Sequence, residues 1–442
     1  MLYPLLRAVV AFALRSFYRL EVRPAAGAPV PVDGPVLFVG NHPNGMVDPA
    51  LFFAVLPREV TFLAKSTLFS IPVLGAVMRA LRALPVYRKQ DDPSQMARNE
   101  GSLEAAAEAL CAGRAITLFP EGKSHSEPQL AELKTGAARI AFRVARRGAQ
   151  LRVVPVGLTY GEKQRFRSRA VVQFGAPVDV AAYVPATEAE EAAQVRALTE
   201  RMAAELRAVT VNLEQWEDLP LVRLAEQLYA LSLKEAPDDA ERLGRFARGL
   251  ALFRQEQPER FEQLRRRMVA FQRRLDLVQA SPDQLSVQYR PWPVVRFVLK
   301  HAVLLGLGLP LYALGVVLFA APYQLARAVI RRKEVELDLR ATFKLLALLG
   351  LGPPWVALCA VAAGWAFGLP VGLAVALVSV PLAGFTGYFL GQVAEVRRDV
   401  AVFFALASRA KLKSGLLGEG ALLQAEMEAL AAEYRARVTA AR

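Results

Sequence analysis

The chain has 442 residues, of which 54% are hydrophobic and 22% are charged, and its formal net charge is +14. This length exceeds one ordinary core, and high apolar content combined with many charges predicts a water-soluble part joined to a membrane part. Because long uncharged stretches accompany the basic charge, we expect a phospholipid membrane and phosphorylated substrates as partners, and no nucleic acid, for which no motif is recognisable.

Residues 1–20, the main part of an N-terminal segment that we expect to span 1–25, are apolar but are broken by Arg7, Arg15 and Arg19. Its uncharged core is too short to cross a bilayer of roughly 30 Å, and no small-residue cleavage site follows it. The pattern therefore predicts an interfacial amphipathic helix with its arginines at lipid phosphates, rather than a signal peptide. The alternative is an ordinary helix packed on the soluble domain.

Residues 26–215 alternate strand and helix patterns, which predicts an α/β domain with a mixed or mostly parallel sheet flanked by helices. In open α/β sheets, functional sites form beyond the carboxyl ends of the strands. Candidate polar residues follow three of the predicted strands. We expect strands at 36–39, 60–64, 115–119, 152–158 and 170–174, and helices at 48–56, 71–81, 93–112 and 134–147.

The loop after the first of these strands holds His42 and Asp48. An aspartate that binds one ring nitrogen of a histidine leaves the other nitrogen free to take a proton from a hydroxyl. Turn chemistry or helix capping would explain the pair equally well if it stood alone. The choice between the two depends on the motifs that follow.

Four sequence blocks in a fixed order resemble the PlsC-like glycerolipid acyltransferases, which acylate glycerol 3-phosphate, dihydroxyacetone phosphate or lysophosphatidate. The resemblance covers about residues 30–180 and implies an α/β acyltransferase domain active in phospholipid biosynthesis. The blocks are Asn41-His42 with Asp48-Pro49, Leu84-Pro85-Val86-Tyr87-Arg88, Phe119-Pro120-Glu121-Gly122, and the run from Val153 to Tyr160.

Two departures from the common pattern point to one branch of this family. Five residues separate His42 from Asp48, where most members have four, and the third block continues Lys123-Ser124-His125 instead of Thr-Arg-Ser. Both features resemble the branch that uses glycerol 3-phosphate or dihydroxyacetone phosphate, which is therefore the implied acceptor. The alternatives are acylation of lysophosphatidate or another lysolipid, and a catalytically idle lipid-binding membrane protein.

The resemblance and the chemistry of the residues lead to the same roles. His42 is expected to act as general base and Asp48 to hold its tautomer, while the acyl group comes from acyl-CoA or acyl-ACP without a cofactor or metal. Cations are needed for the phosphate of the acceptor, and a guanidinium suits this best. The other expected substrate-binding residues are Arg88, Lys65 and Lys123 as phosphate ligands, Glu121 and Gly122 in the acceptor pocket, Ser124 and His125 as substrate contacts or loop caps, and Pro155 at a turn beside the thioester.

Residues 216–290 carry helical spacing of apolar residues and several runs of arginine. We expect amphipathic helices packed on the catalytic domain, with their basic faces in solvent. Within this segment, helices are expected at 219–233 and 238–277, after one at 188–211. The two cysteines, Cys111 and Cys359, exclude a disulfide framework and a cysteine-based metal site.

Residues 291–395 are expected to form C-terminal transmembrane helices. No charged residue occurs at 302–326 or 345–394, and the second interval is long enough for two crossings of roughly 20 residues each. The first interval could cross once or turn back at 306–310. Basic residues on every flank favour a multi-pass membrane protein with a cytoplasmic catalytic domain, a re-entrant first interval and a hairpin turning at 368–370. Residues 396–442 are expected to form a helical tail for a partner or oligomer contact.

Overall fold

The computed structural model describes residues 2–25, 29–88, 91–233, 240–285, 291–332, 337–407 and 409–440. The chain divides into two compact units, one formed by Met1–Thr210 with Ala328–Leu349, and the other by Val211–Arg327 with Gly350–Arg442. The first unit is thus discontinuous in sequence, because a stretch near residue 340 returns to it. The five consecutive segments expected from the sequence stay a prediction.

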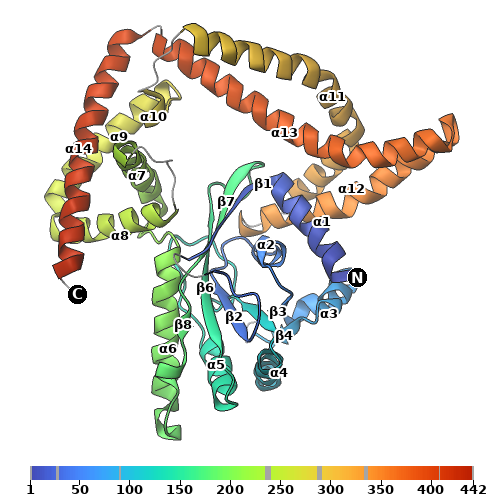
Figure 1. Cartoon of the computed structure of the whole chain (residues 1–442), viewed down its shortest axis with the longest axis vertical. Coiled ribbons are helices and arrows are strands. Elements are labelled where there is room, and N and C mark those ends of the chain that lie inside the picture. The colour runs from blue at the N-terminus through green and yellow to red at the C-terminus, as the bar shows by residue number, and fades with distance from the viewer. Residues whose placement is uncertain are drawn as a thin grey trace. The chain divides into compact units, whose positions relative to one another are not determined.

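A mixed sheet lies at the centre of the first unit (Figure 1). Within the described residues its strands follow the order β1-β7-β6-β2-β5-β3-β4, with β8 beside β6. Neighbouring strands are parallel except that β6 runs antiparallel to β7 and β8. The predicted mixed α/β sheet is confirmed. The strands are β1 (Tyr18–Arg23), β2 (Val36–Gly40), β3 (Val60–Lys65), β4 (Leu84–Val86), β5 (Ala115–Leu118), β6 (Arg152–Tyr160), β7 (Ser168–Phe174) and β8 (Val178–Asp179).

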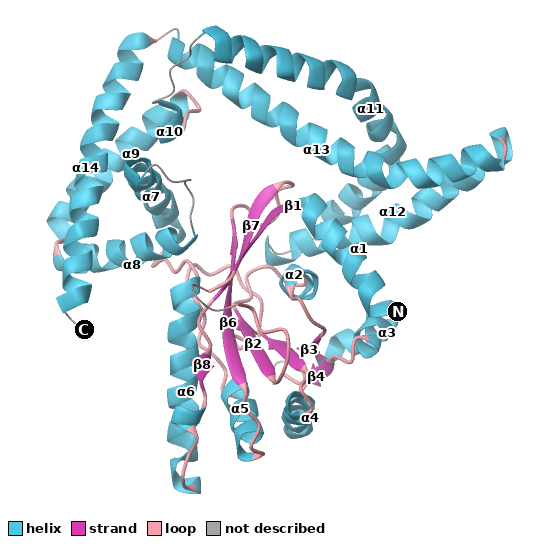
Figure 2. Cartoon of the chain, in the orientation of Figure 1, coloured by secondary structure: helices cyan, strands magenta, loops and turns pink. Residues whose placement is uncertain are grey.

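Helices cover both faces of this sheet (Figure 2). One apolar core joins the sheet to α1 and α2, and another joins it to α4, α5 and α6, so that the central strand β2 is buried along its whole length. The expected helix at 93–112 begins instead as the 3-10 turn η2, Pro93–Arg98. The helices are α1 (Leu2–Phe17), α2 (Val47–Val55), α3 (Pro72–Ala80), α4 (Asn99–Cys111), α5 (Gly136–Arg146) and α6 (Glu188–Val209), with the 3-10 helices η1 (Ser66–Ser70) and η3 (Ala181–Tyr183).

The N-terminal segment is helical only in its first part. Helix α1 buries Ala13, Leu14 and Phe17 in the core of the first unit, and exposes Leu5, Val9 and Phe12. The chain then continues as β1, which pairs in parallel with β7. The expectation of one interfacial helix over 1–25 is therefore wrong for residues 18–23, because a sheet edge satisfies the backbone of this stretch.

The second unit contains a helical assembly of η4 (Trp216–Asp218), α7 (Leu219–Leu233), α8 (Ala240–Glu256), α9 (Pro258–Leu277), α10 (Pro282–Leu285) and α14 (Ala410–Ala440). The tail helix α14 buries Leu416, Leu423 and Met427 in the same core as α7 and α9, so this apolar face is occupied within the chain. The arginines of α9 are not simply solvated, because Arg267 and Arg274 form ion pairs with glutamates of α14.

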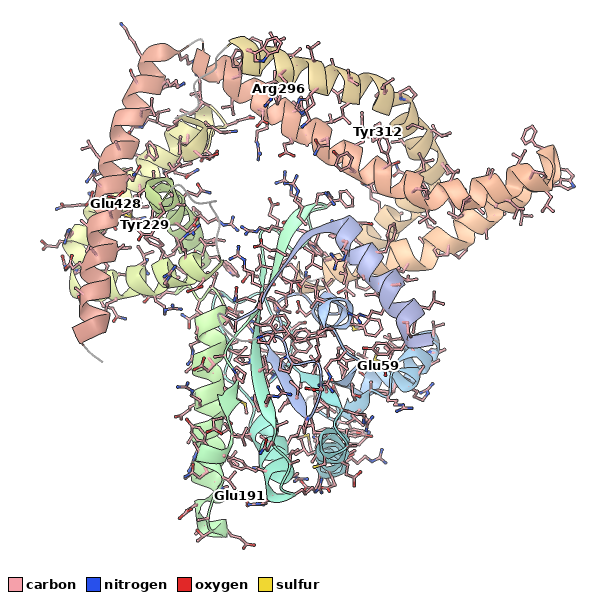
Figure 3. The ribbon with its side chains drawn as sticks, viewed as in Figure 1. Glu59, Glu191, Tyr229, Arg296, Tyr312 and Glu428 are labelled. Carbon is pink, nitrogen blue, oxygen red and sulfur yellow. The ribbon has the colours of Figure 1, made fainter. Side chains whose placement is uncertain are left out.

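Among the described residues, three helices are long and apolar enough to cross a membrane: α11 (Pro291–Arg332), α12 (Leu337–Phe367) and α13 (Leu369–Ala407). The expected re-entrant turn at 306–310 is wrong, because α11 runs continuously through Pro310. The turn at Gly368, with φ of 95°, does separate α12 from α13. Tyr312 of α11, labelled in Figure 3, stacks on Phe389 of α13 with ring centroids 5.0 Å apart.

Candidate active site

The candidate site lies at the carboxyl ends of the parallel strands. Strands β2, β3, β4, β5 and β6 point in the same direction, so the residues that follow them meet at one edge of the sheet. This edge is where open α/β sheets bind their ligands. It brings together His42 after β2, Lys65 at the end of β3, Arg88 after β4, and the loop that starts at Phe119 after β5.

His42 and Asp48 form the central pair of this site. His42 Nδ1 lies 2.8 Å from Asp48 Oδ2, and the imidazole stacks on the Phe119 ring with centroids 4.3 Å apart. Within the described residues, Nε2 of His42 has no hydrogen-bond partner, and 15% of the side chain is exposed. A histidine held at Nδ1 and open at Nε2 has the geometry of a general base.

Asp48 is fully buried, and its two oxygens accept three hydrogen bonds in all. Besides His42, the backbone nitrogen of Asn44 donates to Oδ2 at 2.6 Å, and the Tyr160 hydroxyl donates to Oδ1 at 2.6 Å. Burial, followed by the nearby Asp48 charge, raises the pKa of Tyr160 well above its ordinary value, which keeps the phenol protonated as a donor. These donors stabilise an ionised carboxylate in a buried position.

Tyr160 and Tyr18 are site residues that the sequence interpretation did not single out. Tyr160 was quoted only as the end of the fourth block. Tyr18 accepts a hydrogen bond from Asn44 Nδ2 at 3.1 Å and donates to the backbone oxygen of Lys163. A tyrosine just after an apolar helix gave no signal of this role, because the contact spans 26 residues and depends on β1 joining the sheet.

Glu121 clamps the loop after β5 to the loop that carries His42. Its side chain is only 4% exposed, and Oε1 accepts the backbone N–H of His42 at 2.6 Å. Oε2 accepts the backbone N–H of Ala131 at 2.8 Å and also contacts His125 Nε2. Glu121 therefore joins the two loops through contacts within the protein, and its role in shaping the acceptor pocket stays a prediction.

His125 also joins the loop after β5 to the loop that carries His42. Its backbone nitrogen donates to the backbone oxygen of His42 at 3.1 Å, and its Nδ1 accepts the backbone N–H of Glu127 at 3.2 Å. Because Nδ1 is an acceptor, the proton lies on Nε2, which donates to Glu121. Of the two roles expected for His125, this geometry is that of the loop cap.

The three candidate phosphate ligands differ in their surroundings. Lys65 Nζ forms an ion pair with Asp91 at 3.1 Å, and Lys123 is exposed. Arg88 is half-buried, burial lowers its pKa, and its guanidinium has no ion-pair partner among the described residues. The charge of Asp91 acts on Arg88 as well, though without an ion-pair contact, and the choice of Arg88 as the anion ligand stays a prediction.

The remaining expected residues occupy the loop and the sheet. Gly122 has φ of 74°, a backbone conformation that favours glycine, and Ser124 is half-buried in the same loop. Pro155 does not lie at a turn but inside β6, opposite Val39 of β2. It is tolerated there because the partner on its other side changes at this point, from β8 before it to β7 after it. Groups of three or more His, Cys, Asp or Glu that could hold a metal ion do not occur within the described residues.

Residues 20–159 match the family model of the Acyltransferase family. An uncharacterized acyltransferase of Schizosaccharomyces pombe is 24% identical over 77% of this chain and 65% of its own length. Glycerol-3-phosphate O-acyltransferase 2 of Saccharomyces cerevisiae is 28% identical over 54% of this chain and 34% of its own length. A chloroplastic 1-acyl-sn-glycerol-3-phosphate acyltransferase of Arabidopsis thaliana is 27% identical over 34% of this chain and 38% of its own length.

Among solved structures, the 1-acyl-sn-glycerophosphate acyltransferase PlsC from Thermotoga maritima aligns with 47% of this chain and 82% of its own, at 21% identity and a TM-score of 0.33. The chain spans between about a third and two thirds of the length of the curated relatives from the two yeasts. The family match includes three of the four blocks in full and nearly all of the fourth, together with the His42 and Asp48 pair. The similarity of this chain to the Acyltransferase family thus rests on residues 20–159, which match the family model.

Proposed function

We propose that this protein transfers a fatty acyl group from an acyl thioester, acyl-CoA or acyl-ACP, to the first hydroxyl of glycerol 3-phosphate or to the hydroxyl of dihydroxyacetone phosphate. The observation that carries the proposal is the buried Asp48 carboxylate, which holds Nδ1 of His42 at 2.8 Å and leaves Nε2 open at the edge of the sheet. The two yeast glycerol-3-phosphate O-acyltransferases support the choice of acceptor, since they align with 54% and 48% of this chain.

In this scheme Nε2 of His42 takes the hydroxyl proton while the acceptor oxygen attacks the thioester carbonyl. The new C–O bond forms as the C–S bond breaks, and the leaving thiolate takes the proton back from the imidazolium. Asp48 stabilises that imidazolium and keeps the base in its productive tautomer. Because a thioester is already activated, the scheme requires neither a nucleophilic side chain nor a cofactor.

Arg88 would bind the phosphate of the acceptor, with Lys123 as a second cation. Lys65 is less available, because Asp91 already neutralises part of its charge. Glu121, Gly122, Ser124 and His125 would set the shape of the loop beside the acceptor rather than bind it through charge. Pro155 would act only through the packing of β6.

Acylation of lysophosphatidate is the second candidate, because 1-acyl-sn-glycerol-3-phosphate acyltransferases also align with this chain. The His42 and Asp48 pair, the dyad, would serve both reactions. The two enzymes would differ in whether an apolar groove holds the acyl chain of the acceptor. The three membrane-capable helices support a reaction at a phospholipid membrane in either case. The basic flanks of these helices support a multi-pass arrangement with the catalytic unit on the cytoplasmic side.

The test offers the purified, detergent-solubilised protein a labelled acyl-CoA or acyl-ACP with glycerol 3-phosphate, dihydroxyacetone phosphate or lysophosphatidate. We expect ester formation on glycerol 3-phosphate or dihydroxyacetone phosphate. His42→Ala should lower turnover by about 10²–10⁴-fold, while His301→Ala, on α11, serves as the matched control. Transfer to lysophosphatidate alone would keep the mechanism and replace the acceptor. Absence of transfer to all three would refute the proposal.

A further inference from the structure

The first turns of α12 are a packing element of the catalytic unit. Ala341 and Leu345 are buried in the core that also contains α1 and α2, and Lys344 Nζ donates to the backbone oxygen of Gln164 at 2.7 Å. Ala341 and Leu345 are four residues apart and so share one helix face, whereas Leu346 is exposed. The segment Arg340–Leu349 therefore binds the catalytic unit through one face.

Thr342 lies within this buried segment and is 5% exposed. Its Oγ1 accepts the backbone N–H of Met46 at 3.0 Å, across 296 residues of sequence. Met46 immediately precedes α2, the helix that carries Asp48 in its first turn. Thr342 thus contacts the backbone of the active-site loop directly, two residues from the aspartate of the dyad.

The loop has few other ways to satisfy this amide. The first N–H groups of a helix lack intrahelical acceptors and are usually capped by a nearby side chain. Helix α2 has no such side-chain cap at Met46, although Val47 N donates to the backbone oxygen of Asn44 at 3.0 Å. Met46 is half-buried, and the buried Thr342 hydroxyl is the acceptor that holds its amide, so we infer that the loop depends on Thr342 to keep this conformation.

We propose that Thr342 is a positioning residue for the His42 and Asp48 pair, and that the start of α12 thereby locks the active-site loop. Thr342 touches neither the substrate nor the reacting atoms. It fixes the Met46 amide, and with it the turn from which Asn44 N and the first turn of α2 direct the Asp48 carboxylate toward His42. Loss of the acceptor lets this turn shift, and displacements of about 1 Å can cost on the order of 10²-fold in rate.

This contact also links the active site to the membrane-capable helices. After the packed segment ends at Leu349, roughly 18 residues of α12 remain before Phe367, which corresponds to about 27 Å of helix. That length still suits one crossing of a bilayer core. Helix α12 therefore contains both Thr342, which contacts the active-site loop, and the apolar stretch that would enter the bilayer.

The test compares the full-length wild type with Thr342→Val, which removes the acceptor at nearly constant shape, and with Thr342→Ser, which restores it. Leu346→Ala is the matched control, because it changes an exposed residue of the same helix. Two quantities are measured: kcat and KM for acyl transfer, and hydrogen exchange of the amides in the 41–48 loop. The kinetic readout rests on the proposed function, whereas the exchange readout does not.

We expect Thr342→Val to lower kcat by about tenfold or more with KM changed less than threefold, roughly, and to speed exchange in the 41–48 loop. Thr342→Ser should return both quantities to near the wild-type values, and Leu346→Ala should leave them unchanged. Wild-type kcat and exchange in Thr342→Val would overturn the inference, as would a loss of kcat without faster exchange. If the wild type transfers no acyl group, the proposed function fails, and the exchange comparison alone decides the role of Thr342. If Thr342→Val does not fold, the smaller Thr342→Ala takes its place.

Discussion

The hydroxyl of Tyr160 donates a 2.6 Å hydrogen bond to Oδ1 of Asp48 across 112 residues of sequence. Asp48 Oδ2 meanwhile binds His42, so the strand β6 helps to orient the base through the aspartate. Tyr160 acts on the aspartate rather than on the substrate, and we regard it as a positioning residue. The orientation of His42 and Asp48 therefore depends on the fourth sequence block, which ends at Tyr160, as well as on the first block, which contains the pair itself.

Replacing Tyr160 with Phe should lower kcat without a comparable change in KM. The substitution leaves one oxygen of a buried carboxylate without a donor, and hydrogen bonds to charged groups contribute roughly 1.5–3 kcal/mol. If that difference appears in the transition state, the loss is about tenfold or more. Steady-state kinetics of acyl transfer measure it, with Tyr183→Phe on η3 as control. Equal kcat in the two variants would contradict the role of Tyr160.

Replacing Glu121 with Gln should destabilise the loop pair that it clamps. An amide presents one acceptor oxygen and one donor group, so it cannot accept from His42 N, Ala131 N and His125 Nε2 together. We expect the free energy of unfolding to fall by about 1–3 kcal/mol and activity to fall with it. Thermal denaturation in detergent checks this, and Glu127→Gln, an exposed position in the same loop, is the control. A Glu121→Gln protein as stable as the control would show that the clamp is dispensable.

Replacing Arg88 with Ala should raise the KM for a phosphorylated acceptor about tenfold or more, with a smaller effect on kcat. The half-buried guanidinium forms no ion pair among the described residues, although the charge of Asp91 acts on it, so its donors can form two parallel hydrogen bonds with a phosphate. Arg88→Lys should recover part of the affinity, because an ammonium keeps the charge but not the two parallel bonds. Kinetics with varied acceptor provide the measurement, beside Arg196→Ala on the exposed face of α6. An unchanged KM would assign phosphate binding to other cations.

Alkaline pH should destabilise the catalytic unit through Tyr18 and Tyr160. Burial raises the pKa of both phenols above the ordinary value of 10.0. The folded state therefore keeps protons that the unfolded state loses above this pH. The contribution of each tyrosine to stability is fully present below pH 10.0 and is lost as the pH rises toward the folded-state pKa.

Unfolding followed from neutral to strongly alkaline pH tests this dependence. Tyr18→Phe should make the alkaline loss of stability shallower, because it removes one of the two groups that titrate differently in the folded and unfolded states. Tyr183→Phe should follow the wild-type curve. Identical curves for wild type and Tyr18→Phe would exclude Tyr18 as a source of the dependence.

The sequence by itself predicted the elements whose pattern is local. The apolar runs that became β2, β3, β5, β6 and β7 could be located because a buried strand reads as a short uncharged run between turn residues. Uncharged length predicted the pair α12 and α13 in the same way, whereas α11 was expected to turn back at 306–310 and is instead continuous. The pairing of His42 with Asp48 could also be inferred, because both residues lie on one short loop. Their catalytic roles stay predictions.

Tertiary structure alone decided the contacts between residues that are distant in sequence. Tyr18–Arg23 reads as the end of an apolar helix, yet it becomes a strand because β7 offers it a parallel edge. Three hydrogen bonds of the site join residues far apart in sequence. Glu121 and His42 are 79 residues apart, Asp48 and Tyr160 are 112 apart, and Met46 and Thr342 are 296 apart. No periodicity records such contacts, since hydrogen bonds depend on where the folded sheet brings the backbone. The sequence thus identified the chemical groups, and the fold determined which of them hold the others in place.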